Sequence, residues 1–175
     1  PKLINMYGIT ETTVHVTYRP IARVDIESKA GNIIGVPIPD VELYVLDSYR
    51  NLVLIGVSGE PYVGGAGLAK GYLNRADLTA ERFVDHPFAK GRKLYRSGDL
   101  VRRRADGDIE YVGRIDNQVK ICGYRIELGE IEVVLGQHPM VQSSVVVVRE
   151  DTLGDKRLVA HVVAPPKKSF EAAEI

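Results

Sequence analysis

The stretch from Gly113 to Glu132, GRIDNQVKICGYRIELGEIE, changes its hydrophobic period partway along, and this constrains the fold more than any other part of the chain. Val119 and Ile121 alternate with polar residues, which predicts a strand. A helix is predicted directly afterwards, because apolar residues then recur at helical spacing: Leu128, Ile131, Val134 and Leu135. The charged side chains before this helix cannot all be buried, so they must face water or an anion. Taken alone, the stretch also fits a solvated hairpin and a capped helix.

Composition limits the classes of partner. Lys plus Arg and Asp plus Glu both count 23 in 175 residues, so the basic excess typical of proteins that bind nucleic acid or anionic lipid is missing. The single cysteine, Cys122, allows no internal disulfide and no multi-thiolate metal site. The sequence has no apolar run of membrane length and no signal peptide. We therefore expect a cytoplasmic protein whose partners include neither nucleic acid nor a membrane.

The chain before this stretch predicts antiparallel strands joined by turns. The first hairpin is expected to pair Leu3–Met6 with a strand in which Val14 and Val16 alternate with polar residues, around a turn at Tyr7-Gly8. Further strands are expected within residues 33–54, and Asp106-Gly107 predicts a hairpin with a return strand at 108–112. Asp77 is expected to cap a short helix over residues 78–83.

After the helix of the first paragraph, two more strands are predicted, at residues 141–149 and 157–164. Because Val145 to Val148 form a continuous apolar run, the first of these is expected to be buried on both faces. The predicted fold class is α+β. A mainly antiparallel, distorted and barrel-like sheet is expected over residues 1–115, followed by a hinge and a small, incomplete α+β lobe over residues 116–175.

Polar side chains near the first turn are suited to a nucleotide. The amide of Asn5 can both donate to and accept from the edge of a purine, and Tyr7 offers a ring face for stacking. Thr10 supplies a hydroxyl that suits a phosphate oxygen, and Glu11 supplies a carboxylate that suits Mg²⁺. The alternative is an ordinary hairpin with a capped end.

Four motifs in order resemble the adenylation domains of nonribosomal peptide synthetases, which belong to the adenylate-forming superfamily. They are NMYGITETTVHVT at 5–17, GEPYVGGAGLAKGYL at 59–73, LYRSGDL at 94–100 and GRIDNQVKI..YRIELGEIE at 113–132. The resemblance extends from about Asn5 to Pro165. The form QVKI followed by ELGEIE is similar to the amino-acid-activating branch of the superfamily rather than to the acyl-CoA branch.

The resemblance implies a role for each candidate residue. Asn5 and Tyr7 would contact adenine, Thr10 a phosphate, and Glu11 magnesium. The Asp99 carboxylate would accept hydrogen bonds from both ribose hydroxyls, and the Tyr111 ring would lie near the sugar. Arg114 would contact the ribose and the phosphate. Asp116 would be the hinge, and Lys120 would supply a mobile charge near the nucleotide. Without the resemblance, Asp99 would be read as a turn residue before a strand.

The resemblance also places three residues of the amino-acid pocket in the first motif. Met6 and Val14 would form apolar walls, and His15 could hydrogen-bond a substrate hydroxyl. Because a hydrogen-bonding site can reject an analogue that lacks the hydroxyl by roughly 10⁴-fold, His15 should decide more than Met6. The three side chains are similar to those of threonine-activating domains. The alternative for His15 is a structural residue beside valines.

The implied reaction forms an aminoacyl-AMP from an amino acid and ATP, with Mg²⁺, and then loads the phosphopantetheine arm of a peptidyl carrier protein. A neighbouring condensation domain and an MbtH-like protein are the other implied partners. The family's phosphate loop and catalytic lysine are expected outside these 175 residues, so we expect this piece alone to be inactive. The alternatives are an acyl- or aryl-acid CoA ligase, a non-catalytic adenylation-like binding module, and a chain followed by an inserted domain.

Overall fold

A computed structural model describes residues 1–27, 31–116, 118–121, 124–152 and 155–165. The chain divides into two compact units, residues 1–115 and 116–175. Each unit is described by itself below.

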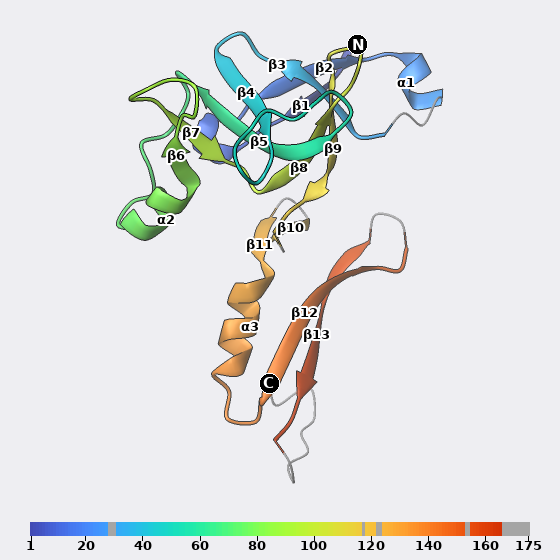
Figure 1. The fold of residues 1–175 in the computed structure, drawn as a ribbon. Coiled ribbons are helices and arrows are strands. Elements are labelled where there is room, and N and C mark those ends of the chain that lie inside the picture. The colour runs from blue at the N-terminus through green and yellow to red at the C-terminus, as the bar shows by residue number, and fades with distance from the viewer. Residues whose placement is uncertain (28–30, 117, 122–123, 153–154, 166–175) are drawn as a thin grey trace. The chain divides into compact units, whose positions relative to one another are not determined.

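Within the described residues, the first unit is built on one nine-stranded sheet (Figure 1). Its strands are β1 (Leu3–Tyr7), β2 (Thr17–Ile21), β3 (Ile33–Pro37), β4 (Val41–Leu46), β5 (Ser58–Gly65), β6 (Phe83–Asp85), β7 (Lys93–Arg96), β8 (Asp99–Arg103) and β9 (Ile109–Arg114). The spatial order is β1-β2-β3-β9-β8-β5-β7-β6, and β4 pairs with β5. Every pairing is antiparallel, as predicted. No pairing among the described strands closes this path into a barrel.

The core of this unit lies against the middle of the sheet, where β5 pairs with three other strands. Val63 of β5, Tyr95 of β7 and Val101 of β8 are fully buried there, together with Ile109 of β9. Burying an aliphatic side chain of this size contributes roughly 1.5 to 3 kcal/mol. This burial holds β8 and β9 in place, and the ends of these two strands carry candidate site residues.

The first hairpin is confirmed as an antiparallel pair of β1 and β2, but the predicted tight turn at Tyr7-Gly8 and the predicted strand at Val14 and Val16 are wrong. A 3₁₀ turn at Thr10–Thr12 follows β1, and β2 begins only at Thr17. Thr13 and Val14 have φ values of 63° and 68°. Strands need negative φ values, so neither residue can extend a strand. Val14 and His15 therefore lie in a loop.

Two short α-helices lie in the described part of this unit, α1 (Arg23–Glu27) and α2 (Ala76–Arg82). The prediction that Asp77 caps a helix is also wrong, because α2 begins at Ala76 and Asp77 lies in its first turn. The Asp77 carboxylate instead accepts hydrogen bonds from the guanidinium of Arg75 at 3.1 Å.

In its described residues, the second unit contains two separate hairpins and one helix. Strands β10 (Gln118–Ile121) and β11 (Tyr124–Glu127) pair with each other, as do β12 (Ser143–Glu150) and β13 (Lys156–Val163). Helix α3 (Leu128–Gly136) follows β11 directly, so the predicted change of period is confirmed. The Glu132 carboxylate of α3 accepts a hydrogen bond from the Val146 amide of β12 at 2.8 Å.

The expectation that β12 is buried on both faces is wrong. Val146 is 4% exposed, whereas its neighbour Val145 is 56% exposed. The strand pairs with β13 and packs against α3, which accounts for one covered face.

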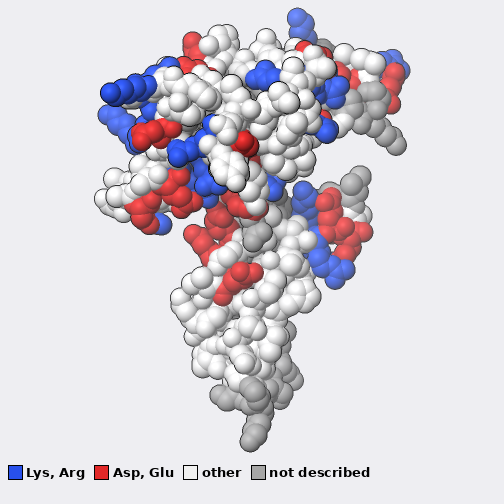
Figure 2. Space-filling view, viewed as in Figure 1, with Lys and Arg blue, Asp and Glu red and all other residues white. Residues whose placement is uncertain are grey.

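No helix in the described part of the chain is both long enough and apolar enough to cross a membrane. On the face shown in Figure 2, Lys and Arg side chains lie among Asp and Glu side chains rather than in one large basic patch.

Candidate nucleotide site

The structure brings Tyr7, Asp99 and Arg114 together from three strands. Asp99 begins β8 and Arg114 ends β9, and the two are direct partners in the antiparallel register. Arg114 Nη1 donates to Asp99 Oδ1 at 2.7 Å, and the Tyr7 hydroxyl at the end of β1 donates to Asp99 Oδ2. Residues 92 positions apart in the sequence thus share one carboxylate.

Burial strengthens this cluster. The side chains of Asp99 and Arg114 are only 7% and 15% exposed, so their ion pair is partly shielded from water. Burial, and then the negative charge of Asp99, raise the pKa of the Tyr7 hydroxyl well above its usual range. Tyr7 therefore remains a hydrogen-bond donor to the carboxylate.

The other two residues predicted to lie near the base and sugar are close by. The Tyr111 ring of β9 lies 6.2 Å from the Tyr7 ring, centroid to centroid. Asn5 Nδ2 donates to the Ile33 carbonyl at 2.8 Å, so one donor of its amide is used to tie β1 to β3.

Asp99 is supported by a residue of β5 to which the sequence analysis assigned no role, Glu60. The Glu60 carboxylate, 7% exposed, accepts from the Gly98 amide at 2.8 Å and from Arg96 Nε at 3.0 Å. The Ile115 amide donates to the Gly98 carbonyl at 2.9 Å. Glu60 therefore holds the turn from which Asp99 projects. The signal for this in the sequence was a glutamate directly before the apolar residues Pro61, Tyr62 and Val63.

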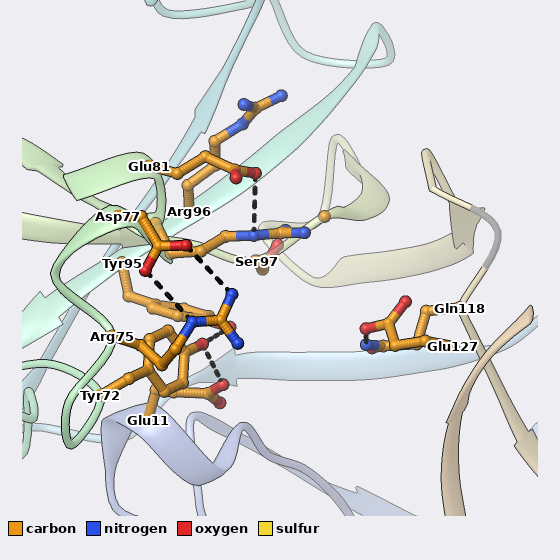
Figure 3. A network of polar contacts seen from close by, with 12 residues as sticks. Glu11, Tyr72, Arg75, Asp77, Glu81, Tyr95, Arg96, Ser97, Gln118 and Glu127 are labelled. Atoms are coloured by element: carbon orange, nitrogen blue, oxygen red, sulfur yellow. Dashed lines mark hydrogen bonds and ion pairs between the residues drawn. The ribbon is translucent and has the colours of Figure 1, made fainter. Parts of the chain in front are cut away.

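Glu11 lies in a second polar cluster of the same unit. Its Oε1 accepts a hydrogen bond from the Tyr72 hydroxyl at 2.5 Å, and the Tyr72 hydroxyl lies 3.2 Å from that of Tyr95 (Figure 3). Glu11 is 8% exposed, whereas Thr10 beside it is exposed. Burial, and then the hydrogen bond to Glu11, raise the pKa of Tyr72.

The Glu11 carboxylate suits a magnesium ion that is shared with substrate phosphates. The described residues contain no cluster of three or more acidic, histidine or cysteine side chains that could form an all-protein metal site. Mg²⁺ in phosphoryl-transfer sites is commonly held by one or two carboxylates together with substrate phosphates. A single oriented carboxylate beside the exposed Thr10 hydroxyl meets that requirement.

Of the three predicted pocket residues, Met6 lies in β1, and Val14 and His15 lie in the loop that follows it. Met6 and Val14 are 41% and 60% exposed, and His15 is exposed. The loop is held by Thr13, whose hydroxyl donates to the Gly67 carbonyl at 2.7 Å. It also passes so close to Gly8 that a β-carbon there would lie 1.5 Å from the Val14 carbonyl oxygen.

In the second unit, Asp116 follows the boundary between the units, and its carboxylate accepts from the Gln118 amide at 3.2 Å. The backbone of Lys120 lies in β10 opposite Arg125. The Lys120 side chain lies outside the described part of the structure, as does Cys122.

Comparisons with known proteins identify the family to which the chain belongs. The family model for AMP-binding enzymes matches residues 1–73. A dimodular nonribosomal peptide synthase from Bacillus subtilis (strain 168) is 56% identical over 176 residues, which cover 100% of this chain and 7% of that protein. Tyrocidine synthase 3 from Brevibacillus parabrevis is 49% identical over 176 residues, or 99% of this chain and 3% of that protein. The chain thus spans only a small part of each of these relatives.

Solved structures show the same fold. IdnL1 gives a TM-score of 0.89 at 30% identity, covering 99% of this chain and 35% of that one. PA1221, described as a nonribosomal peptide synthetase protein containing adenylation and PCP domains, gives 0.81 at 33% identity, covering 96% and 34%. The chain belongs to the adenylate-forming superfamily of AMP-binding enzymes. Within it, the chain is part of an adenylation domain of the nonribosomal peptide synthetase type.

Proposed function

We propose that this chain supplies the ribose-binding strands and the metal carboxylate of an amino-acid-activating adenylation domain. In the proposed reaction, an amino acid carboxylate attacks the α-phosphorus of ATP, pyrophosphate leaves, and an aminoacyl adenylate remains. The observation that best supports this is the convergence of Tyr7, Asp99 and Arg114 on one partly buried cluster.

Each of these side chains would contact a different part of the nucleotide. An ionised carboxylate only accepts hydrogen bonds, so Asp99, already bonded to Tyr7 and Arg114, would accept those of the ribose hydroxyls as well. Arg114 keeps a positive charge beside the nucleotide at any working pH. The ring of Tyr7 would stack on adenine, with Asn5 at the base edge and Tyr111 near the sugar.

Negative charge gathers around phosphorus as the reaction proceeds, so positioned cations and donors supply most of the stabilisation. Glu11 would hold Mg²⁺, which supplies positive charge to the phosphates when bound. Thr10 would donate its hydroxyl to a phosphate oxygen, and Lys120 would add a mobile charge.

We further propose that the substrate is L-threonine or a similar small hydroxy or aliphatic amino acid, selected by Met6, Val14 and His15. Amino-acid-dependent pyrophosphate exchange should be measured on the complete adenylation domain with all proteinogenic amino acids and a set of carboxylic acids. Threonine is expected to give the highest kcat/KM. Turnover with carboxylic acids alone would instead assign an acyl- or aryl-acid ligase, and failure to bind ATP would assign a binding module.

The second step is proposed to transfer the acyl group to the phosphopantetheine arm of a peptidyl carrier protein after a rotation about Asp116. The division of the chain between Ile115 and Asp116 supports a hinge there. An Asp116→Pro substitution fixes φ near −65°, so one lobe orientation should be lost. We expect carrier loading to fall at least roughly tenfold while pyrophosphate exchange stays within about threefold. Equal loss of both activities would argue against a hinge at Asp116.

A further inference from the structure

Tyr72 is tied to Glu11 by a contact that neither the sequence motifs nor the proposed roles explain. Its hydroxyl donates to Glu11 Oε1 at 2.5 Å, although the two residues lie 61 positions apart (Figure 3). Hydrogen bonds from a neutral donor to an ionised acceptor are shorter and roughly twice as strong as neutral ones. The carboxylate is therefore held in one orientation.

Hydrogen bonds and close packing against α2 fix the backbone around Tyr72. The Tyr72 amide donates to Thr79 Oγ1 of α2 at 2.9 Å, and Thr79 Oγ1 donates to the Arg75 carbonyl at 2.7 Å. Gly71 has φ of 148°, and a β-carbon there would lie 2.5 Å from Thr79 Cγ2. The chain thus needs glycine at 71 to bring Tyr72 against α2.

The ring of Tyr72 is fixed as well. It packs edge-on against Phe83 at 5.6 Å between centroids, and Phe83 packs against Tyr95 at 5.3 Å. The hydroxyls of Tyr72 and Tyr95 lie 3.2 Å apart, which restricts the Tyr72 hydroxyl further. On the Glu11 side, the Ala69 amide donates to the Glu11 carbonyl at 2.8 Å. Side chain and backbone of the glutamate are thus both attached to the segment that carries Tyr72.

We propose that Tyr72 is a positioning residue for the metal-binding carboxylate of Glu11. It would act by holding one carboxylate oxygen so that Mg²⁺ and the phosphates meet a preformed ligand. This inference rests on the proposed function, because it takes Glu11 as the magnesium ligand. Residues that orient a metal ligand in this way typically change metal affinity by about 10- to 100-fold when removed.

The test uses Tyr72→Phe in the complete adenylation domain, with Tyr95→Phe as the matched control. Each variant loses one hydroxyl of the same pair: the first loses the 2.5 Å bond from Tyr72 to Glu11, and the second loses the 3.2 Å contact between the two hydroxyls. Binding of Mn²⁺, as a probe for Mg²⁺, would be followed by electron paramagnetic resonance in the presence of ATP. Thermal unfolding and metal-free AMP binding would be measured on the same samples.

We expect Tyr72→Phe to weaken Mn²⁺ binding at least roughly tenfold, with metal-free AMP binding within about twofold of the wild type. Tyr95→Phe should leave the Mn²⁺ affinity within about twofold. If Tyr72→Phe unfolds, the double variant Tyr72→Phe/Tyr95→Phe removes both hydroxyls of the pair and should show the same loss of metal affinity.

An unchanged Mn²⁺ affinity in a folded Tyr72→Phe or double variant, with only a lower melting temperature, would reduce Tyr72 to a structural residue and overturn the inference. The proposed function would survive that result. If the wild-type domain bound ATP but no Mn²⁺ with it, both the magnesium role of Glu11 and the inference would fall.

Discussion

Replacing Asp99 with asparagine in the complete adenylation domain is expected to lower kcat/KM for ATP by roughly 10²-fold or more. Asparagine has a similar shape but no charge, and it places an NH₂ group where one carboxylate oxygen stood. If the NH₂ group replaces Oδ1, the Arg114 guanidinium, 15% exposed, loses its partner; if it replaces Oδ2, the Tyr7 hydroxyl loses its acceptor. Hydrogen bonds to a charged group contribute about 1.5 to 3 kcal/mol, and two ribose hydroxyls would lose them at once. Steady-state kinetics and calorimetric titration with AMP measure the effect.

Asp106→Asn is the matched control for this variant. Asp106 lies in the turn between the same two strands, its side chain is 51% exposed, and it pairs with Arg104 at 3.2 Å. Because exposed ion pairs contribute about 0 to 1 kcal/mol, this change should leave ATP kinetics unaltered. Circular dichroism would confirm that Asp99→Asn is folded, since breaking a buried pair costs about 3 to 5 kcal/mol of stability. Wild-type AMP affinity in folded Asp99→Asn would contradict the assignment of Asp99 to the ribose.

The second large effect is expected from Gly8→Ala. A β-carbon at Gly8 would lie 1.5 Å from the carbonyl oxygen of Val14 and 2.7 Å from its carbonyl carbon. Both atoms belong to the backbone, so no side-chain rotation can relieve the clash, and the loop must move. That loop carries Val14 and His15, and a displacement of about 1 Å can cost roughly 10²-fold in rate. We expect kcat/KM for the amino acid to fall by about that factor, and stability to fall by about 1 to 3 kcal/mol.

The control for Gly8→Ala is Gly129→Ala in α3. A β-carbon there meets no atom within 4 Å, and alanine favours a helix over glycine by about 1 kcal/mol. This variant should be as stable as the wild type or more so, with unchanged amino-acid kinetics. Unchanged kinetics in Gly8→Ala as well would show that the loop after β1 does not shape the substrate pocket.

The parts of the fold that follow local rules could be predicted from the sequence. The Asp106-Gly107 turn predicted the β8–β9 hairpin, although the register shift between Leu100 and Val101 that brings Asp99 opposite Arg114 has no such local signal. The change of period between Val119 and Leu128 likewise predicted a strand followed by a helix. These features depend on residues close together in the chain.

Contacts between distant segments could not be predicted in this way. The loop after β1 looked like a strand because Val14 and Val16 alternate with polar residues. Its left-handed backbone depends on the close approach to Gly8 and on the bond from Thr13 to Gly67. Such tertiary contacts override local propensity.

The supporting residues of the site were missed for the same reason. Glu60 and Tyr72 lie in the glycine-rich motif at residues 59–73, where the sequence suggested no polar partner for either. Their roles depend on Gly98 and Glu11, which lie 38 and 61 residues away. No pattern within the stretch identifies those partners.

The central claim is that side chains from the end of β1 and from the β8–β9 hairpin hold a single nucleotide. A crystal structure of the complete adenylation domain with bound AMP tests it most directly. We expect both ribose hydroxyls within hydrogen-bond distance of the Asp99 carboxylate, the adenine against the Tyr7 ring, and Arg114 beside the ribose or phosphate. AMP bound elsewhere, with the Asp99 carboxylate contacting only Tyr7 and Arg114, would contradict the claim.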